Sequence, residues 1–249
     1  MESSSGSPDR GAVTPVTARA HVFVGDLEAP ILDSGDHRHL VRVLRLAPGS
    51  DVTAGDGAGR WRLCRLTDGP ALEAAGPIVA EPRPEPPITV AFALVKGERP
   101  ELAVQKLTEL GVDRIAPFVA GRSVVRWEAV RAERQLERWR SIARQAAMQC
   151  RRTWLPDVAP VATFDSVAAL PGAVLADAAG TRPTLDRPVV LVGPEGGWTP
   201  GERGSGLPTV RLGAHVLRSE TAAITAGAVL TGLRAGILAD KDQSGHIVC

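Results

Sequence analysis

Two glycine-rich stretches near the C-terminal end of the chain have the residue types of a ligand site. The first is LVGPEGGW (Leu191–Trp198), in which a single carboxylate, Glu195, stands among glycines. The second is LGAHVLRSETA (Leu212–Ala222), which carries Arg218 and Glu220 at a predicted helix start. Glycine lets a ligand lie directly against the backbone, whose unused N–H and C=O groups can then bind it. The pattern predicts a site in which backbone groups hold a ligand and a few charged side chains act on it.

The charged residues of the second stretch favour a ligand over a purely structural explanation. Proline and glycine commonly form tight turns, so GPEGG alone is equally well explained as a pair of turns. An arginine at the N-terminus of a helix, however, opposes the helix dipole at a cost on the order of a few tenths of a kcal/mol or more. A bound anion would offset that cost, which favours a ligand near Arg218.

Strands and helices alternate through the rear part of the chain and would position these two stretches. Apolar runs predict strands buried on both faces, and periodic apolar residues predict helices. The expected strands are 88–95, 112–120, 173–177, 189–193 and 209–213, and the expected helices are 100–111, 128–150 and 219–236. This order is typical of an α/β domain with a mostly parallel sheet, in which ligands bind beyond the carboxyl ends of the strands. Both glycine-rich stretches follow such a strand end.

A small β-rich part precedes the α/β domain. Short alternating stretches from Ala20 to Val79 predict a small barrel with one short helix in HRHLVRVLRL. GDGAGR (Gly55–Arg60) is interpreted as a hairpin turn, because it lacks GxGxxG spacing and no helix follows it. Four prolines in AEPRPEPP (Ala80–Pro87) predict a stiff linker. The expected organisation is a disordered tail (1–18), a front domain (19–80), a linker (81–87), the α/β domain (88–240) and a C-terminal tail (241–249).

Composition argues against several other classes of protein. An apolar fraction of 44% supports a sizeable core, and a net charge of +1 argues against a general polycation. Three dispersed cysteines and five histidines without HExxH spacing indicate neither a disulfide framework nor a metal site. The sequence has no apolar run of about eighteen residues and a polar N-terminus unlike a signal peptide. We therefore expect a cytoplasmic protein without a membrane span and without a metal.

The two glycine-rich stretches, in this order, closely resemble the C-terminal signature of the RsmE family of the SPOUT superfamily. The resemblance runs from about His21 to Gly236 and extends to HRHLVRVLRLAPGSDV, to QKLTELGVDRIAP with Arg122 and Ser123, and to Gln149, Arg152 and Pro156. The family methylates N3 of a uridine in 16S ribosomal RNA with S-adenosylmethionine as the donor. The resemblance implies a SPOUT-type methyltransferase domain ending in a deep trefoil knot, although knots are nearly absent from proteins in general. It also implies a PUA-like β-barrel in front, which helps to hold RNA, and a homodimer with each active site near the dimer interface.

Two positions depart from the family pattern. Met148 stands where the family commonly has an acidic residue, and RGSGLP (Arg203–Pro208) replaces the helix that usually lies between the two motifs. We expect that helix to be reduced to about a turn, with altered rigidity and with the chemistry kept.

The implied reaction assigns roles to the two charged residues. Uridine N3 is a poor nucleophile until its proton leaves, so the site must help to remove the proton and stabilise the resulting charge. Arg218 is the predicted charge stabiliser, or it grips the target phosphate; a surface salt bridge with Glu220 or another neighbour is the alternative. Glu195 is the candidate general base or an electrostatic partner of the sulfonium; a backbone cap that shapes the loop is the alternative.

The predicted cofactor site has two walls. Apolar side chains would sandwich the adenine of S-adenosylmethionine while backbone groups recognise its edge. The predicted contacts are Leu191, Gly193, Gly196 and Gly197 on one wall and Leu212, Gly213, Val216 and Leu217 on the other. Ala176 is a weaker candidate, and Trp198 either covers the pocket or belongs to the core.

Arginines that could contact RNA are concentrated in two segments, one in the front domain with Arg38, Arg42 and Arg45 and one from Arg122 to Arg152. Between Arg122 and Arg152 there are nine arginines against three glutamates, with like charges four residues apart that destabilise a helix unless a phosphate backbone relieves them. A solvated helix or a dimer contact is the alternative. The predicted RNA-binding residues are Arg38, Arg42, Arg45, Arg122, Arg144 and Arg152. The expected partner is 16S rRNA or the small ribosomal subunit.

Two other functions remain open from the sequence. One is a related SPOUT methyltransferase that acts on tRNA or on another rRNA position. The other is a non-catalytic RNA-binding module whose glycine-rich loops are only structural.

Overall fold

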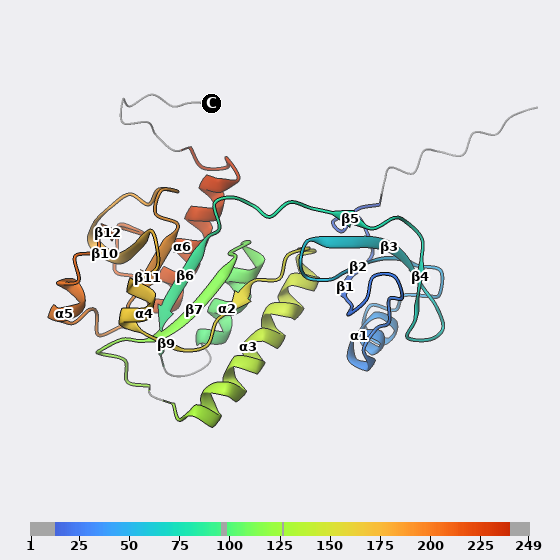
Figure 1. Cartoon of the computed structure of the whole chain (residues 1–249), viewed down its shortest axis with the longest axis horizontal. Helices are drawn as coiled ribbons and strands as arrows, with labels where there is room; N and C mark the ends of the chain where they lie inside the picture. The colour runs from blue at the N-terminus through green and yellow to red at the C-terminus, as the bar shows by residue number, and fades with distance from the viewer. Residues whose placement is uncertain (1–12, 96–98, 126, 240–249) are drawn as a thin grey trace, which may run out of the picture. The chain divides into compact units, whose positions relative to one another are not determined.

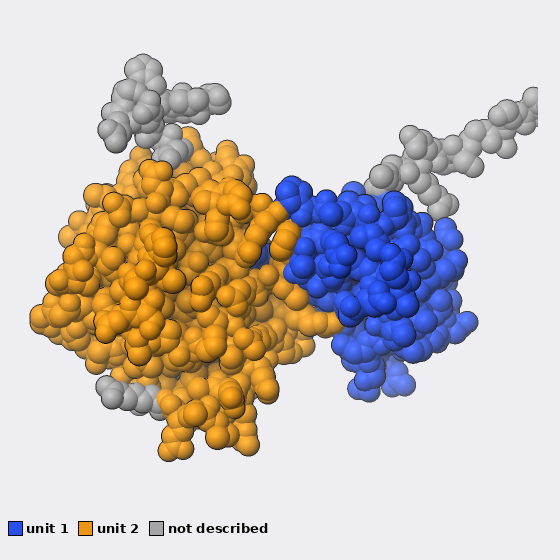
Figure 2. All heavy atoms as spheres, viewed as in Figure 1, with its two compact units in different colours: residues 1–82, 148–153 blue, residues 83–147, 154–249 orange. Residues whose placement is uncertain are grey.

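The computed structural model describes residues 13–95, 99–125 and 127–239 and divides into two compact units. Figure 2 shows unit 1, residues 1–82 and 148–153, in blue and unit 2, residues 83–147 and 154–249, in orange. Each unit has its own apolar core. The predicted C-terminal tail, 241–249, and the first twelve residues of the predicted N-terminal tail lie outside the described residues.

Unit 1 is a five-stranded sheet with one helical segment (Figure 1). The helical segment connects β1 to the parallel strand β2, and the other pairs of the sheet are antiparallel, in the order β1-β2-β3-β4 with β5 also on β3. The elements are β1 (His21–Phe23), α1 (Ser34–Arg38), the π-helical η1 (His39–Val43), β2 (Asp51–Gly55), β3 (Arg60–Leu66), β4 (Leu72–Ala74) and β5 (Val79–Ala80). The described pairings end at β1 and at β4, so closure into a barrel stays a prediction.

The hairpin at GDGAGR is confirmed. Strands β2 and β3 run antiparallel with Gly55 opposite Trp61. The Asp56 carboxylate accepts hydrogen bonds from the N–H groups of Ala58 (2.7 Å) and Arg60 (3.1 Å) and pairs with the Arg60 guanidinium at 2.7 Å. These bonds stabilise the turn and leave the loop with a structural role.

The segment Met148–Thr153 belongs to unit 1, although the sequence placed it in the α/β domain. The Arg151 guanidinium donates to the carbonyls of Ala18 (2.7 Å) and Arg19 (2.8 Å). The Thr153 hydroxyl donates to the Glu81 carboxylate at 2.7 Å. The Arg151 contacts also order the chain before β1: residues 14–17 form a turn and Ala18 is buried, so residues 13–18 are not the disordered tail that we expected.

Unit 2 is an α/β domain with a parallel sheet, as predicted (Figure 1). The strand order is β12-β10-β11-β6-β7-β8, with β9 also on β7, and every described pair is parallel. The strands are β6 (Thr89–Ala93), β7 (Arg114–Val119), β8 (Asp157–Val158), β9 (Ala162–Thr163), β10 (Ala173–Thr181), β11 (Val189–Val192) and β12 (Thr209–Val210). The helices are α2 (Arg99–Glu109), α3 (Ala129–Gln149), α4 (Phe164–Ala168), α5 (Pro200–Arg203) and α6 (Ser219–Arg234).

Both faces of this sheet are buried, which explains the unbroken apolar run of β6. Val90 and Phe92 contribute to a core with residues of α2, α3 and α6. Ala91 and Ala93 contribute to a second core with Val167 of α4 and with Trp198. Strand β11 pairs on one side with β10, which precedes it in the chain. On its other side it pairs with β6, which comes much earlier. The trefoil knot implied by the family resemblance stays a prediction.

A buried ion pair fixes the amino end of the sheet. Arg234, the last residue of α6, pairs with Asp113, and their side chains are 10% and 2% exposed. The Arg234 guanidinium also donates to the carbonyls of Pro86 (3.1 Å) and Gly111 (2.8 Å), and Asp113 accepts from the Ile88 N–H at 2.9 Å. The end of α6, the end of the linker and the entries to β6 and β7 therefore share one polar cluster.

Candidate functional site

Three loops meet at the carboxyl edge of the sheet, where the sequence predicted the ligand. They follow β10, β11 and β12, which lie next to one another in parallel (Figure 1). LVGPEGGW leaves β11 after Val192, and LGAHVLR leaves β12 after Val210. Parallel strands that are neighbours bring their carboxyl ends to the same edge, so the two predicted stretches are parts of one region.

The GPEGGW loop contains a tight turn with Glu195 exposed at its tip. The Gly197 N–H donates to the Pro194 carbonyl at 2.8 Å, which closes the turn. Gly197 has a φ of 69°, a left-handed conformation that favours glycine. A side chain there would meet no atom within 4 Å, so backbone conformation requires this glycine and close packing does not.

Three hydrogen bonds hold this loop to other parts of unit 2. The Ser219 hydroxyl donates to the Gly193 carbonyl at 3.1 Å, the Trp198 indole N–H donates to the Ala176 carbonyl at 3.0 Å, and the Arg122 guanidinium donates to the Gly196 carbonyl at 2.8 Å. The donors come from the start of α6, from the loop itself and from the segment after β7. The loop is therefore tied directly to the start of α6, to β10 and to the segment after β7.

Two of the glycines lie against side chains of the protein itself, so a larger residue at either position would meet Trp198 or Arg122. A Cβ at Gly193 would lie 3.0 Å from the Trp198 ring, and a Cβ at Gly196 would lie 3.4 Å from the Arg122 Cβ. Trp198 is 4% exposed and stacks on Phe118 with ring planes 7° apart. Of the two explanations for this tryptophan, the core position is confirmed.

The LGAHVLR loop leaves more of its residues accessible. Gly213 is exposed, and a Cβ there would make only ordinary contact with Leu217 at 3.6 Å. Leu212 and Leu217 are half-buried against the core, and Val216 is 95% exposed. This loop therefore offers an apolar, glycine-lined wall.

Leu191 differs from the other predicted cofactor contacts. Its side chain is fully buried in the core shared with α4, so only its backbone could contact a ligand.

Arg218 is the N-cap residue of α6, and its side chain is exposed. Serine is a residue type that often caps a helix. Here, however, Ser219 is the first helical residue, is 5% exposed and uses its hydroxyl to hold Gly193. Because that bond connects the two glycine-rich loops, it keeps Arg218 beside GPEGGW. No local pattern in the sequence indicates this contact, because the two residues lie 26 positions apart.

Helix α5 is a single turn, as the shortened segment predicted, and a buried carboxylate stabilises it. Thr199 and Glu202 form a capping box, in which the Glu202 Oε2 accepts from the Thr199 N–H at 2.7 Å. The Glu202 Oε1 accepts from the Gly121 N–H at 2.8 Å. Burial alone would raise the pKa of Glu202, but the hydrogen bonds from Gly121 and Thr199 together with the nearby Arg122 charge lower it.

Strand β10 carries an irregularity that the sequence did not indicate. Both Ala176 and Thr181 lie opposite Val210, so the residues between them bulge out at the carboxyl edge. A Cβ at Gly180 would lie 2.5 Å from the Val210 backbone, so no larger residue fits. Asp177 in the bulge pairs with Arg203 of α5 at 2.9 Å.

The comparisons with known proteins agree with this arrangement. Residues 82–231 match the model of an RNA methyltransferase domain, and residues 32–72 match that of an RNA methyltransferase PUA domain. Ribosomal RNA small subunit methyltransferase E of Mycobacterium tuberculosis is 34% identical over 222 residues, which cover 80% of this chain and 85% of the relative. The chain belongs to the RsmE family.

Other relatives agree with this membership. The Synechocystis ribosomal RNA small subunit methyltransferase E is 34% identical over 233 residues, covering 83% of this chain and 74% of the relative. The structure of the Neisseria gonorrhoeae ribosomal RNA small subunit methyltransferase E bound to S-adenosyl methionine has a TM-score of 0.71 and 28% identity, and the match covers 86% of this chain and 97% of that one. A Legionella pneumophila methyltransferase in complex with the cofactor SAM gives a TM-score of 0.73 and 26% identity, covering 85% and 96%. The predicted family is confirmed, and so is the predicted α/β fold with a mostly parallel sheet.

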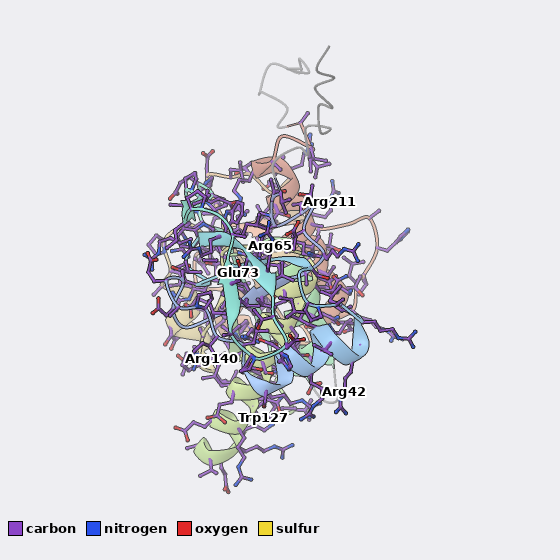
Figure 3. The ribbon with its side chains drawn as sticks, turned by 90° about the vertical axis from the view of Figure 1, so that its right-hand side faces the viewer. Arg42, Arg65, Glu73, Trp127, Arg140 and Arg211 are labelled. Carbon is purple, nitrogen blue, oxygen red and sulfur yellow. The ribbon has the colours of Figure 1, made fainter. Side chains whose placement is uncertain are left out.

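The arginines predicted to bind RNA differ in their surroundings in this RsmE-family chain. Arg38, Arg42 and Arg45 are exposed on or just after the helical segment of unit 1, where Figure 3 labels Arg42. Arg122 already donates to Gly196, whereas Arg144 and Arg152 are half-buried.

Internal partners relieve part of the positive charge on α3. Arg138 pairs with Glu101 at 2.9 Å, and Arg131 lies over the Trp127 ring at 5.8 Å. The like-charged arginines of this helix therefore need less relief from a phosphate backbone than the sequence suggested.

The described residues offer neither a metal site nor a membrane-spanning helix. No group of three or more His, Cys, Asp and Glu side chains in the described part of the chain could hold a metal ion. None of the helices described is long and apolar enough to cross a membrane.

Proposed function

We propose that the chain transfers the methyl group of S-adenosylmethionine to N3 of a uridine in the 16S rRNA of the small ribosomal subunit. The observation that carries this proposal is the hydrogen bond from Ser219 to Gly193, which brings the guanidinium-bearing start of α6 to the glycine-rich loop after β11. The family membership and the S-adenosylmethionine in the Neisseria gonorrhoeae relative support it. Such a substrate is consistent with the cytoplasmic location that we expected.

The residues at this edge fit the cofactor. Leu212 and Leu217 present half-buried apolar side chains for an adenine ring, and the exposed Gly213 leaves backbone accessible beside them. The peptide groups of Gly196 and Gly197 face this wall from the other loop in our proposal, with Gly193 and the Leu191 backbone at the strand end. When bound, S-adenosylmethionine supplies an electrophilic methyl group on a sulfonium.

Arg218 would stabilise the charge that develops on the base. Removing the N3 proton costs about 1.4 kcal/mol for each unit by which its pKa exceeds the ambient pH. The first N–H groups of α6 have no partner within the helix, so the helix start and the Arg218 guanidinium favour an anion at the same place. Groups that are fixed in advance near a developing oxyanion are worth about 3–4 kcal/mol each.

Glu195 is our candidate for the group that accepts the N3 proton. It stands at the exposed tip of a turn whose closing hydrogen bond and left-handed Gly197 fix the backbone. A base acts within hydrogen-bond distance of its proton or through one water, and a fixed turn is suited to hold it there. Alignment of the two reactants by these loops would supply several kcal/mol more, up to roughly 7–11.

RNA would be held by the arginines of both units. In unit 1, the exposed Arg38, Arg42 and Arg45 and the half-buried Arg152 would contact phosphates, and Arg144 would do so in unit 2. We also propose a homodimer, which the resemblance to the family implies. Analytical ultracentrifugation tests the dimer, and a monomer at micromolar concentration would contradict it.

Two measurements test the proposed function. Calorimetry should detect binding of S-adenosylmethionine, whereas no binding at millimolar cofactor would favour a non-catalytic RNA-binding module. Ribosomal RNA from a strain lacking the activity should gain one methyl group on uridine N3, mapped by mass spectrometry. A mark on ribose, on cytidine or on tRNA would contradict the assignment.

A further inference from the structure

Glu202 is a buried carboxylate that joins two segments far apart in the sequence. It is 6% exposed and lies on α5, beyond the GPEGGW loop. Its two oxygens have different partners: Oε1 accepts from the Gly121 N–H, and Oε2 accepts from the Thr199 N–H (2.7 Å) and from the Thr199 hydroxyl (2.9 Å). The first contact crosses from α5 to the segment after β7, 81 residues earlier in the chain.

The residue next to Gly121 holds the GPEGGW loop. Arg122 donates to the Gly196 carbonyl at 2.8 Å and packs against the space that a side chain at Gly196 would occupy. Gly121 itself admits no side chain, because a Cβ there would lie 2.7 Å from the Thr199 methyl group. The Glu202 carboxylate therefore fixes the backbone from which Arg122 extends, and Arg122 fixes the centre of the turn that presents Glu195.

We propose that Glu202 is a positioning residue, which acts through Arg122 to hold the Gly196 peptide and thereby the turn that carries Glu195. The expected effect on catalysis rests on the function proposed above. The expected effect on the position of the turn does not depend on that function. It also assigns Arg122 a second role besides RNA contact: its guanidinium belongs to the scaffold of the turn.

The substitution Glu202→Gln tests this arrangement because an amide cannot replace both oxygens. Its NH₂ group would face either the Gly121 N–H or the Thr199 N–H, so donor would meet donor and one of the two contacts must open. We expect faster amide hydrogen exchange across residues 193–198 in the protein without cofactor, the Gly197 N–H included. Exchange in β6 and β7 should stay unchanged. Glu133→Gln, at an exposed position of α3, is the matched control and should alter neither.

Catalytic measurements give the second readout. In Glu202→Gln, loss of a backbone hydrogen bond to the Glu202 carboxylate should weaken S-adenosylmethionine binding by about tenfold. Misplacement of the turn should lower kcat on the order of 100-fold. Arg122→Ala should produce a similar loss, and the double variant should lose little more than either single variant, because both act along one chain of contacts. Arg122→Ala also keeps the test available if Glu202→Gln does not fold.

Different results would overturn the two proposals. If the wild-type protein does not bind S-adenosylmethionine, the proposed function fails, while the exchange experiment still tests Glu202. Suppose that wild type binds the cofactor and that Glu202→Gln lowers only the Tm. If amide hydrogen exchange in residues 193–198, the Kd for the cofactor and kcat are all unchanged, then Glu202 has only a structural role. Additive losses in the double variant would show that Glu202 does not act through Arg122.

Discussion

The two ends of the parallel sheet in unit 2 use charged residues in opposite ways. At the amino end, Asp113 and Arg234 are buried together, and both side chains also make hydrogen bonds to backbone groups. At the carboxyl end, Arg218 and Glu195 are exposed, and the loops that carry them are held through backbone carbonyls by Ser219 and Arg122. Removing one partner of a buried pair leaves an uncompensated charge in the core, whereas an exposed side chain on a fixed backbone can be reached by a ligand.

The largest expected effect is a loss of stability when the ion pair at the amino end of the sheet is disrupted. Arg234→Met should lower the free energy of unfolding by about 3–5 kcal/mol, because it leaves the Asp113 carboxylate buried without its partner. Denaturant unfolding measures the loss. The double variant Asp113→Asn with Arg234→Met should recover part of it, since no charge then remains buried. A loss below about 1 kcal/mol in the single variant would contradict a stabilising role for this pair.

The corresponding change at the carboxyl end should act on activity alone. Arg218→Ala should lower kcat by about 100- to 1,000-fold, because it removes the cation that faces the developing charge on the base. Stability should stay within about 0.5 kcal/mol of wild type, since the side chain is exposed. Binding of S-adenosylmethionine, measured by calorimetry, should be retained. Unchanged turnover would remove Arg218 from the mechanism.

Two glycines of the site separate space used by the protein from space used by a ligand. Gly193→Ala should destabilise the protein by about 1–3 kcal/mol, because the new methyl group would lie 3.0 Å from the Trp198 ring. Gly213→Val should leave stability nearly unchanged and weaken cofactor binding by tenfold or more, since it fills the proposed adenine wall. Thermal unfolding and calorimetry on both variants measure the two effects. A normal Kd for Gly213→Val would contradict the pocket.

The smallest expected effect concerns His21, whose imidazole is buried in unit 1. Burial, together with the nearby Arg151 charge, lowers the pKa of His21 to about 4. The unfolded chain binds a proton near its model value of 6.5, so unfolding takes up a proton at intermediate pH and stability falls as the pH falls. The free energy of unfolding of unit 1 should drop by about 1 kcal/mol between about pH 7 and pH 5.5.

Two variants check the origin of that slope. His21→Gln should remove the pH dependence, because the titrating group is gone. His39→Gln, at an exposed position, should leave it in place. Equal slopes in all three proteins would contradict the assignment to His21.

Local sequence signals predicted the elements of the site but not the contacts between them. Apolar runs located β6, β7 and β11, and the glycine-rich stretches located the two loops, because these signals lie within a few neighbouring residues. The Ser219–Gly193 bond joins residues 26 apart and the Glu202–Gly121 bond joins residues 81 apart, so no periodicity reports them.

The amino-end cluster was missed for the same reason. Asp113 and Arg234 are 121 residues apart, and each alone reads as an ordinary surface charge near the end of an element. The sequence also could not tell whether a glycine admits a ligand or a neighbouring side chain. Gly193 and Gly213 occur in similar contexts, but only the folded chain places Trp198 against the first.

A crystal structure with bound S-adenosylmethionine tests the central claim most directly. The account predicts the cofactor between GPEGGW and LGAHVLR, its adenine against Leu212 and Leu217 and its methyl group on the side of Arg218. A cofactor bound at another edge of the sheet, or with its methyl group directed away from Arg218, would contradict it.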